Sequence, residues 1–142
     1  MRDGAKHAKA GKTMDKVWLG LFAVGGGSAI GGWARWGLAL WLNPRHPHFF
    51  WGTFAANAIG GFLVGIAVAY FSRHANVAPE WRLAIITGFL GGLTTFSTYS
   101  AEVVVLIERG EMAWAMLVAG SHLAASLLLT AFGFWVYRQF TV

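Results

Sequence analysis

The stretch Gly88-Phe-Leu-Gly-Gly-Leu-Thr-Thr-Phe-Ser-Thr-Tyr-Ser100 lies within an apolar run long enough to cross a membrane, yet it consists largely of glycines, hydroxyl side chains and aromatic rings. In a bilayer, backbone groups that leave a helix cannot bond to water, so an interruption must be buried by protein or line a polar cavity. Interrupted helices at membrane depth are where transporters bind ions and small substrates. The stretch therefore predicts a third membrane helix that is broken mid-membrane, and a role in transport.

The composition is that of an integral membrane protein. Of the 142 residues, 56% are hydrophobic and 12% are charged, whereas a globular domain carries about 25% charged residues. Four apolar segments have the length of roughly 20 residues that a transmembrane helix needs. We therefore predict a single all-α membrane domain over residues 15–142, with four spans at about 17–42, 49–71, 81–107 and 112–137. Tryptophans, which favour the membrane–water interface, fall at the junctions of these spans: Trp18, Trp41, Trp51, Trp81, Trp114 and Trp135.

Residues 1–14 form a polar, basic tail before the first span. We interpret it as a segment that faces solvent or lipid headgroups, or as a cloning remnant, and we predict a lipid bilayer rather than a nucleic acid as its partner. The other arginines near the ends of the spans divide almost evenly between the side of the termini (Arg73, Arg82, Arg138) and the opposite side (Arg45, Arg109). Because positive charge favours the cytoplasmic side, the basic residues at the N-terminus favour cytoplasmic termini when they are counted. Without them, the chain has almost no preferred orientation.

Polar side chains also occur inside the second and fourth spans. Asn57 lies deep in the second span, where its amide either bonds another helix or offers its donors to an anion. His122, Ser126 and Thr130 recur every four residues and therefore form one polar stripe along the fourth span. Serine and threonine can instead bond carbonyls of their own helix, so both interpretations remain open from the residues alone.

The interruption itself presents two kinds of group. Carbonyl oxygens freed around Gly91–Thr94 offer the negative ends of backbone dipoles, which suit a small hard cation. Phe96 and Tyr99 are three residues apart, and their ring edges, together with hydroxyls such as that of Ser97, form an electropositive lining without formal charge. Such a lining favours a small anion that must be released again. Simple packing of the two rings at a helix interface is the alternative.

Two charged residues fall within the spans. Arg35 either snorkels to the surface or draws anions into a vestibule. Glu102 follows the interruption by about one turn, and it pairs with Arg35 or another group, stays protonated or lies at a pore mouth. No nucleophile-elbow, HExxH or phosphate-loop pattern occurs in the sequence, so we predict that the protein is not an enzyme.

Three ordered motifs resemble those of the small bacterial fluoride channels of the CrcB/Fluc family. They are Gly26-Gly-Ser-Ala-Ile-Gly-Gly-Trp-Ala-Arg35, Gly52-Thr-Phe-Ala-Ala-Asn-Ala-Ile-Gly-Gly-Phe62 and Gly88-Phe-Leu-Gly-Gly-Leu-Thr-Thr-Phe-Ser-Thr-Tyr99. The resemblance implies a passive, highly selective channel that exports fluoride across the bacterial inner membrane and so confers fluoride resistance. It implies a fluoride pathway along Asn57, Phe96, Tyr99, His122, Ser126 and Thr130. From the residues themselves we add Ser97 to this pathway, and Arg35 and Glu102 as charges of a vestibule.

The resemblance also implies an antiparallel, dual-topology homodimer, which the even distribution of arginines fits. A structural sodium ion would lie at the dimer centre, held by the backbone carbonyls of Gly91 and Thr94 from both subunits. This chain has Tyr99 where the family usually has Phe. The substitution keeps the ring edge and adds a hydroxyl that either donates to fluoride and slows conduction or points away.

Two other functions remain as alternatives. A small dual-topology multidrug/proton antiporter would use a membrane carboxylate, for which Glu102 is the candidate. That class, however, places its glutamate in the middle of the first span, where this chain has none. A structural membrane subunit would only pack against larger partners, and the polar character of the third span argues against it.

Overall fold

The computed structural model describes residues 2–141, with side chains from Met14 onward. The side chains of residues 1–13, on which the predicted basic tail depends, lie outside this part. All regular elements of the described chain are helices: α1 (Arg2–Leu42), the short 3-10 helix η1 (Asn43–Arg45), α2 (Trp51–Arg73), α3 (Pro79–Arg82), the π-helix η2 (Leu83–Leu90), α4 (Gly91–Leu93), α5 (Phe96–Glu108) and α6 (Met112–Gln139).

Four helical segments of the described chain are long and apolar enough to cross a membrane. They are Met14–Arg45, Trp51–Arg73, Pro79–Glu108 and Met112–Gln139. The prediction of an all-α membrane protein with four spanning helices is therefore confirmed.

The ends of the helices follow from local backbone chemistry. Pro79 occupies the first turn of α3, where its missing N–H breaks no helical bond. Gly110 ends α5 with a φ of 74°, a left-handed conformation that glycine adopts without steric cost. Gly110 N donates to Ile107 O and Glu111 N donates to Leu106 O, both at 2.9 Å. These two bonds are the Schellman pattern, and they turn the chain sharply into α6.

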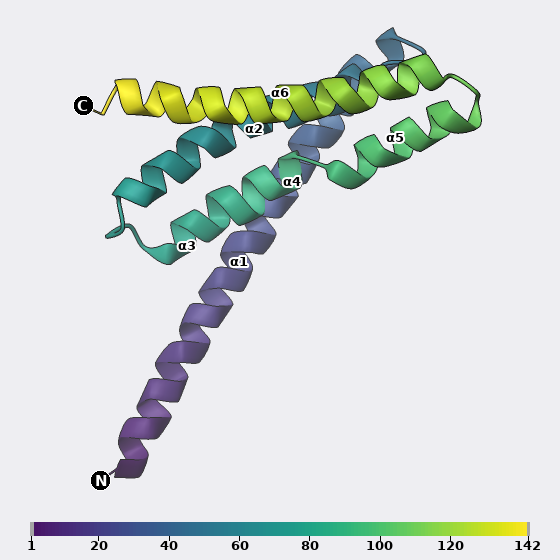
Figure 1. The fold of residues 1–142 in the computed structure, drawn as a ribbon. Coiled ribbons are helices and arrows are strands. Elements are labelled where there is room, and N and C mark those ends of the chain that lie inside the picture. Colours follow the sequence, from purple (N-terminus) through teal and green to yellow (C-terminus); the bar gives the residue numbers. More distant parts are fainter. Residues whose placement is uncertain (1, 142) are drawn as a thin grey trace.

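The spans pack in two pairs through glycines. The second and fourth spans, α2 and α6, run side by side, and η2 and α4 pack along α1 (Figure 1). A Cβ added at Gly65 would overlap the Thr130 carbonyl, and one added at Gly31 would overlap the Phe89 carbonyl. Helices in lipid have no hydrophobic drive to associate. Close van der Waals contact between backbones at small residues favours their association instead. Gly27 and Gly31 on α1, and Gly61 and Gly65 on α2, are four residues apart and lie at these helix contacts.

The third span is assembled from several short pieces. The π-helix η2 is a rare form that is often found at functional sites. Thr94 and Thr95 have extended backbones, with φ/ψ of −84°/154° and −151°/121°. The helix consequently stops at Leu93 and restarts at Phe96, with the Thr95 hydroxyl capping the new helix by accepting from Thr98 N at 3.1 Å.

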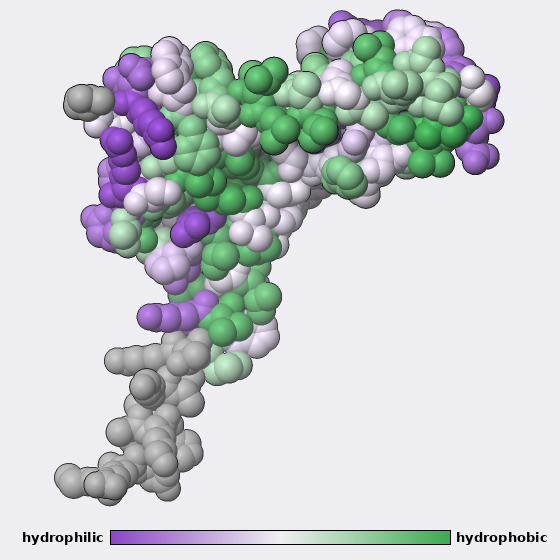
Figure 2. Space-filling view, in the orientation of Figure 1, coloured by the Kyte–Doolittle hydropathy of each residue, from purple (hydrophilic) through white to green (hydrophobic). Residues whose placement is uncertain are grey.

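Much of the apolar surface is exposed. On the face shown in Figure 2, hydrophobic residues cover the middle of the α2–α6 layer and hydrophilic residues gather toward its two ends. Two small clusters are buried, one around Leu106 and Val118 and one around Leu90 and Leu93. Exposed apolar surface of this extent indicates contact with lipid or with other protein.

Two glycines of α6 provide a matched test of this packing. A methyl group at Gly133 would overlap the Phe62 carbonyl, whereas one at Gly120 would meet nothing within 4 Å. We expect Gly133→Ala to lower the free energy of unfolding by about 1–3 kcal/mol, the usual cost of overpacking. Gly120→Ala should leave it unchanged or raise it by up to about 1 kcal/mol, because alanine is the better helix former. Thermal unfolding of the purified protein in detergent measures both, and equal unfolding temperatures would contradict the glycine contact between α2 and α6.

Candidate functional site

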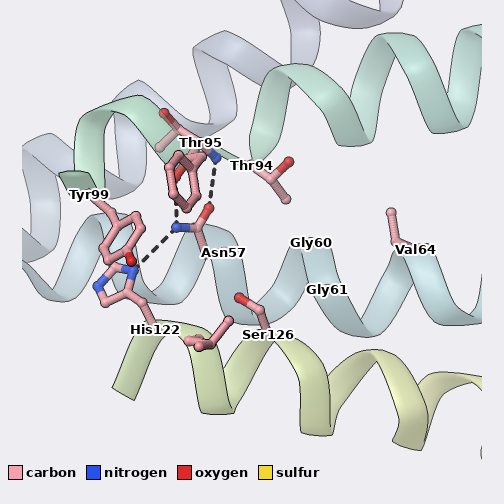
Figure 3. Close-up of a pocket in the computed structure, with 11 residues that line it drawn as sticks. Asn57, Gly60, Gly61, Val64, Thr94, Thr95, Tyr99, His122 and Ser126 are labelled. Atoms are coloured by element: carbon pink, nitrogen blue, oxygen red, sulfur yellow. Dashed lines mark hydrogen bonds between the residues drawn. The ribbon is translucent and has the colours of Figure 1, made fainter. Parts of the chain in front are cut away.

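Asn57, on α2, holds the extended residues of the third span (Figure 3). Its Oδ1 accepts from Thr95 N at 2.7 Å, and its Nδ2 donates to Thr95 O at 3.0 Å. The side chain is only 8% exposed, and a buried group without a partner costs about 1–3 kcal/mol. The two bonds thus replace the helical partners that Thr95 lacks. The structure shows the helix-bonding role of Asn57, and its role toward an anion stays a prediction.

The same bonds free two carbonyl oxygens. In a continuous α-helix, Thr95 N would donate to Gly91 O and Thr98 N would donate to Thr94 O. Here Thr95 N donates to Asn57, and Thr98 N donates to the Thr95 hydroxyl. The carbonyls of Gly91 and Thr94 therefore lose their usual donors. Oxygen atoms of this kind suit a hard cation, so the two residues predicted to hold sodium have chemistry that fits it.

A cavity of about 310 Å³ lies beside Asn57. Its walls come from α2, the extended segment, the start of α5 and the middle of α6. Among the lining residues are Asn57, Phe96, Tyr99, His122 and Ser126. The structure thus brings together predicted pathway residues from three spans.

Two predicted pathway residues do not line this cavity. The Ser97 hydroxyl lies 3.4 Å from the Thr95 hydroxyl, on the exposed side of α5. The Thr130 hydroxyl donates to Gly61 O at 3.0 Å and joins α6 to α2. In contrast, the Ser126 hydroxyl faces the cavity without a hydrogen bond to the residues drawn around it (Figure 3).

Three rings form one wall of the cavity. Tyr99 stacks on His122 with ring centroids 5.0 Å apart and an angle of 16° between the planes. Phe96 meets Tyr99 edge to face, with centroids 5.2 Å apart. Phe96 is 77% exposed, although it lines the cavity. Because ring edges carry partial positive charge, this wall offers electropositive edges without a formal charge.

Asn57 also sets the tautomer of His122. Its Nδ2 lies 3.3 Å from His122 Nδ1. An amide nitrogen only donates, so Nδ1 is the acceptor and a neutral His122 carries its proton on Nε2. His122 is 3% exposed, and Nε2 has no hydrogen-bond partner among the described residues. His122 thus holds a buried donor that is free to bind a small acceptor.

Glu102 is buried one turn beyond Tyr99. Its Oε1 accepts from the Thr53 hydroxyl at 2.5 Å, and within residues 2–141 its Oε2 has no partner. The observed partner is therefore Thr53 and not Arg35. Sequence reasoning missed Thr53, although its position four residues before Asn57, on the same face of α2, was a usable signal.

Arg35 reaches the extended segment from α1. Its Nε donates to Gly92 O at 3.1 Å, and its Nη1 lies 3.5 Å from Thr98 Oγ1. Arg35 does not line the cavity described above. The vestibule role expected for Arg35 stays a prediction.

The sequence matches a known protein family and several named relatives. The sequence profile of the family described as CrcB-like protein, Camphor Resistance (CrcB), matches residues 22–134. A protein of Cupriavidus necator named fluoride-specific ion channel FluC is 58% identical over 120 residues, which cover 84% of this chain and 95% of that protein. Proteins of the same name from Ralstonia pickettii and Thiobacillus denitrificans are 53% identical over 123 residues and 55% identical over 113 residues. These matches cover 87% and 80% of this chain, and 98% and 91% of the respective relatives.

Substitution of Asn57 tests whether its two hydrogen bonds to Thr95 stabilise the extended segment. Asn57→Leu removes both bonds to Thr95, and we expect it to lower the free energy of unfolding by about 1–3 kcal/mol because the Thr95 backbone loses its partners. Ser126→Ala, in the same cavity, should leave stability within about 0.5 kcal/mol. Thermal unfolding in detergent compares the two. An Asn57→Leu protein as stable as Ser126→Ala would show that these bonds do not hold the segment.

Proposed function

This chain belongs to the CrcB-like protein family, and on that basis we propose that it conducts fluoride passively and selectively across a membrane. The relatives compared above are named ion channels, and the family is a channel family rather than an enzyme family. The observation that carries the proposal is the cavity of about 310 Å³ beside the extended segment. Its lining joins an amide, a hydroxyl and ring edges on three spans.

The cavity has the chemistry to replace the water around a small anion. Fluoride is tightly hydrated, so a narrow pore must offer many modest donors in exchange. The Ser126 hydroxyl and the ring edges of Phe96 and Tyr99 are such donors. Asn57 Nδ2 lies 3.3 Å from His122 Nδ1, which is the longer of its two donor contacts. If Nδ2 donates to the ion in place of His122, Asn57 adds one more donor. The shorter bond to Thr95, at 3.0 Å, meanwhile keeps the backbone in place.

Selectivity and release follow from the same lining. None of the described lining residues is an aspartate, glutamate, lysine or arginine. A lining of dipoles binds an anion weakly enough for it to leave, which conduction requires. Chloride is larger and meets these donors with poorer geometry. The relatives give no support to the antiporter or structural-subunit interpretations, because they are fluoride-specific channels by name.

We further propose that two copies form an antiparallel, dual-topology homodimer. Exposed apolar side chains on all four spans support a partner or lipid at these faces, and Phe96, at 77% exposed, lies beside a cavity that one chain leaves open. A second copy would close that side. The near-even distribution of arginines supports insertion in both orientations.

A sodium ion at the dimer centre is part of the same proposal. The carbonyls of Gly91 and Thr94, freed of their usual donors, would hold it together with those of the second copy. Such an ion supplies a fixed positive charge and joins the two broken helices.

We place the protein in the bacterial inner membrane, as a multi-pass protein with four spanning helices. A passive channel there exports fluoride whenever the cytoplasmic concentration exceeds the external one. Such export would protect a cell that accumulates fluoride after entry of the neutral acid.

Ion release from proteoliposomes tests the channel. Vesicles loaded with potassium fluoride or potassium chloride receive a potassium ionophore, and ion-selective electrodes record release. We expect fluoride to leave and chloride to stay. Tyr99→Phe keeps the ring that stacks on His122 and should conduct at least as fast as the wild type. Tyr99→Leu removes the ring and should slow release at least about tenfold, or about 1.4 kcal/mol in the barrier.

Two results would count against this account. Equal release of fluoride and chloride by the wild-type protein would reject selective conduction. Equal fluoride rates in the wild type, Tyr99→Phe and Tyr99→Leu would reject a role for the ring edge while leaving the channel itself in place.

Dual topology is measurable because the chain has no cysteine. Ala75→Cys places one thiol in the exposed connector between α2 and α3. In intact cells, a membrane-impermeant maleimide should label about half of these thiols, because each orientation exposes the connector on one side. It should label all of them once the membrane is permeabilised. Complete or absent labelling in intact cells would indicate a single orientation.

A further inference from the structure

We infer that Arg35 is a positioning residue, whose guanidinium spans the extended segment of the third span and leaves the Gly91 and Thr94 carbonyls for the cation. This inference rests on the proposed channel function, and it concerns how one chain shapes the site. It assigns Arg35 a role different from that of a vestibule charge.

The guanidinium bonds both sides of the extended segment. Arg35 Nε donates to Gly92 O at 3.1 Å, within α4, and Nη1 lies 3.5 Å from the hydroxyl oxygen of Thr98, in the first turn of α5. The planar guanidinium presents its donors in a rigid fork. One side chain from α1 therefore sets the distance between the end of α4 and the start of α5.

Arg35 belongs to a chain of hydrogen bonds that crosses the segment. The Thr95 hydroxyl donates to Thr98 Oγ1 at 2.9 Å and accepts from Thr98 N at 3.1 Å. Asn57 binds the Thr95 backbone from α2. Arg35 thus binds the segment from α1, and Asn57 binds it from α2. The bonds between Thr95 and Thr98 connect these two sets of contacts.

The contact at Gly92 distinguishes Gly92 O, which Arg35 binds, from the carbonyl oxygens of Gly91 and Thr94. A continuous helix would supply Phe96 N to Gly92 O, and here Arg35 donates to that oxygen. A positive charge at the carboxyl end of a helix is favourable. Gly92 O is thereby satisfied by the chain's own cation, while the donors of Gly91 O and Thr94 O go elsewhere.

Close packing brings Arg35 within reach. A Cβ added at Gly92 would lie 2.5 Å from the Ser28 carbonyl oxygen and 3.1 Å from Gly32 N. Ser28, Gly32 and Arg35 share one face of α1, because residues three and four apart are neighbours on a helix. The glycine contact and the arginine contact are therefore parts of one interface.

The experiment compares Arg35→Met, which removes the donors, with Thr98→Val. The second variant removes the Arg35–Thr98 contact, together with the acceptor of the Thr95 hydroxyl, without changing charge. Arg109→Gln is the control, because it removes a charge from an exposed turn. Fluoride release is measured over a range of fluoride concentrations. In parallel, the unfolding temperature is measured in sodium and in N-methyl-D-glucamine, a cation too large for the site.

We expect Arg35→Met to lower the maximal fluoride rate at least about tenfold, equivalent to about 1.4 kcal/mol in the barrier, and to lose most of the stabilisation by sodium. Thr98→Val should show the same two defects to a smaller extent, because Arg35 keeps its bond to Gly92 O. The defects of the double variant should be less than the sum of the two, because both variants remove the Arg35–Thr98 contact. Arg109→Gln should match the wild type. If Arg35→Met does not fold, Thr98→Val carries the same test.

The outcomes separate the two proposals. A defect in Arg35→Met that disappears at saturating fluoride, with Thr98→Val normal, would overturn the positioning role in favour of a vestibule charge. Unchanged maximal rates and sodium stabilisation in both variants would also overturn it. Wild-type protein that releases no fluoride would instead reject the proposed channel.

Discussion

The structure depends on how the backbone at Thr94 and Thr95 is satisfied. A helix that stops and restarts leaves amide and carbonyl groups without partners, and a membrane offers no water to replace them. Asn57 bonds both backbone groups of Thr95, the Thr95 hydroxyl caps α5, and Arg35 binds Gly92 O. These bonds require α1 and α2 to lie within side-chain reach of one segment, and the glycine contacts between the spans allow that approach.

The same bonds produce the two polar surfaces of the site. The donors that a continuous helix would use on Gly91 O and Thr94 O bond to side chains instead, and these are the two carbonyls proposed to hold a cation. The other surface, in the cavity, presents ring edges and donors from Phe96, Tyr99, His122 and Ser126. The proposed cation site and the proposed anion pathway thus depend on one interruption of one helix.

Much of the fold and part of the site could be predicted from the sequence. Apolar segment lengths predicted the four spanning helices. The polar stripe of the fourth span was less informative, because Ser126 lines the cavity whereas Thr130 bonds to Gly61. Helical periodicity places residues on a face, and only the neighbouring helix determines which of them meet a cavity and which meet a carbonyl.

The sequence by itself determined the class of the protein and its four spans, because hydrophobic length is a local property. The tertiary structure decided which partner each polar group takes: Thr53 for Glu102, Thr95 and His122 for Asn57, Gly92 and Thr98 for Arg35. These pairs join residues between 38 and 65 positions apart. Their choice depends on how closely the glycine faces of the helices approach, which is a property of packing and not of any one segment.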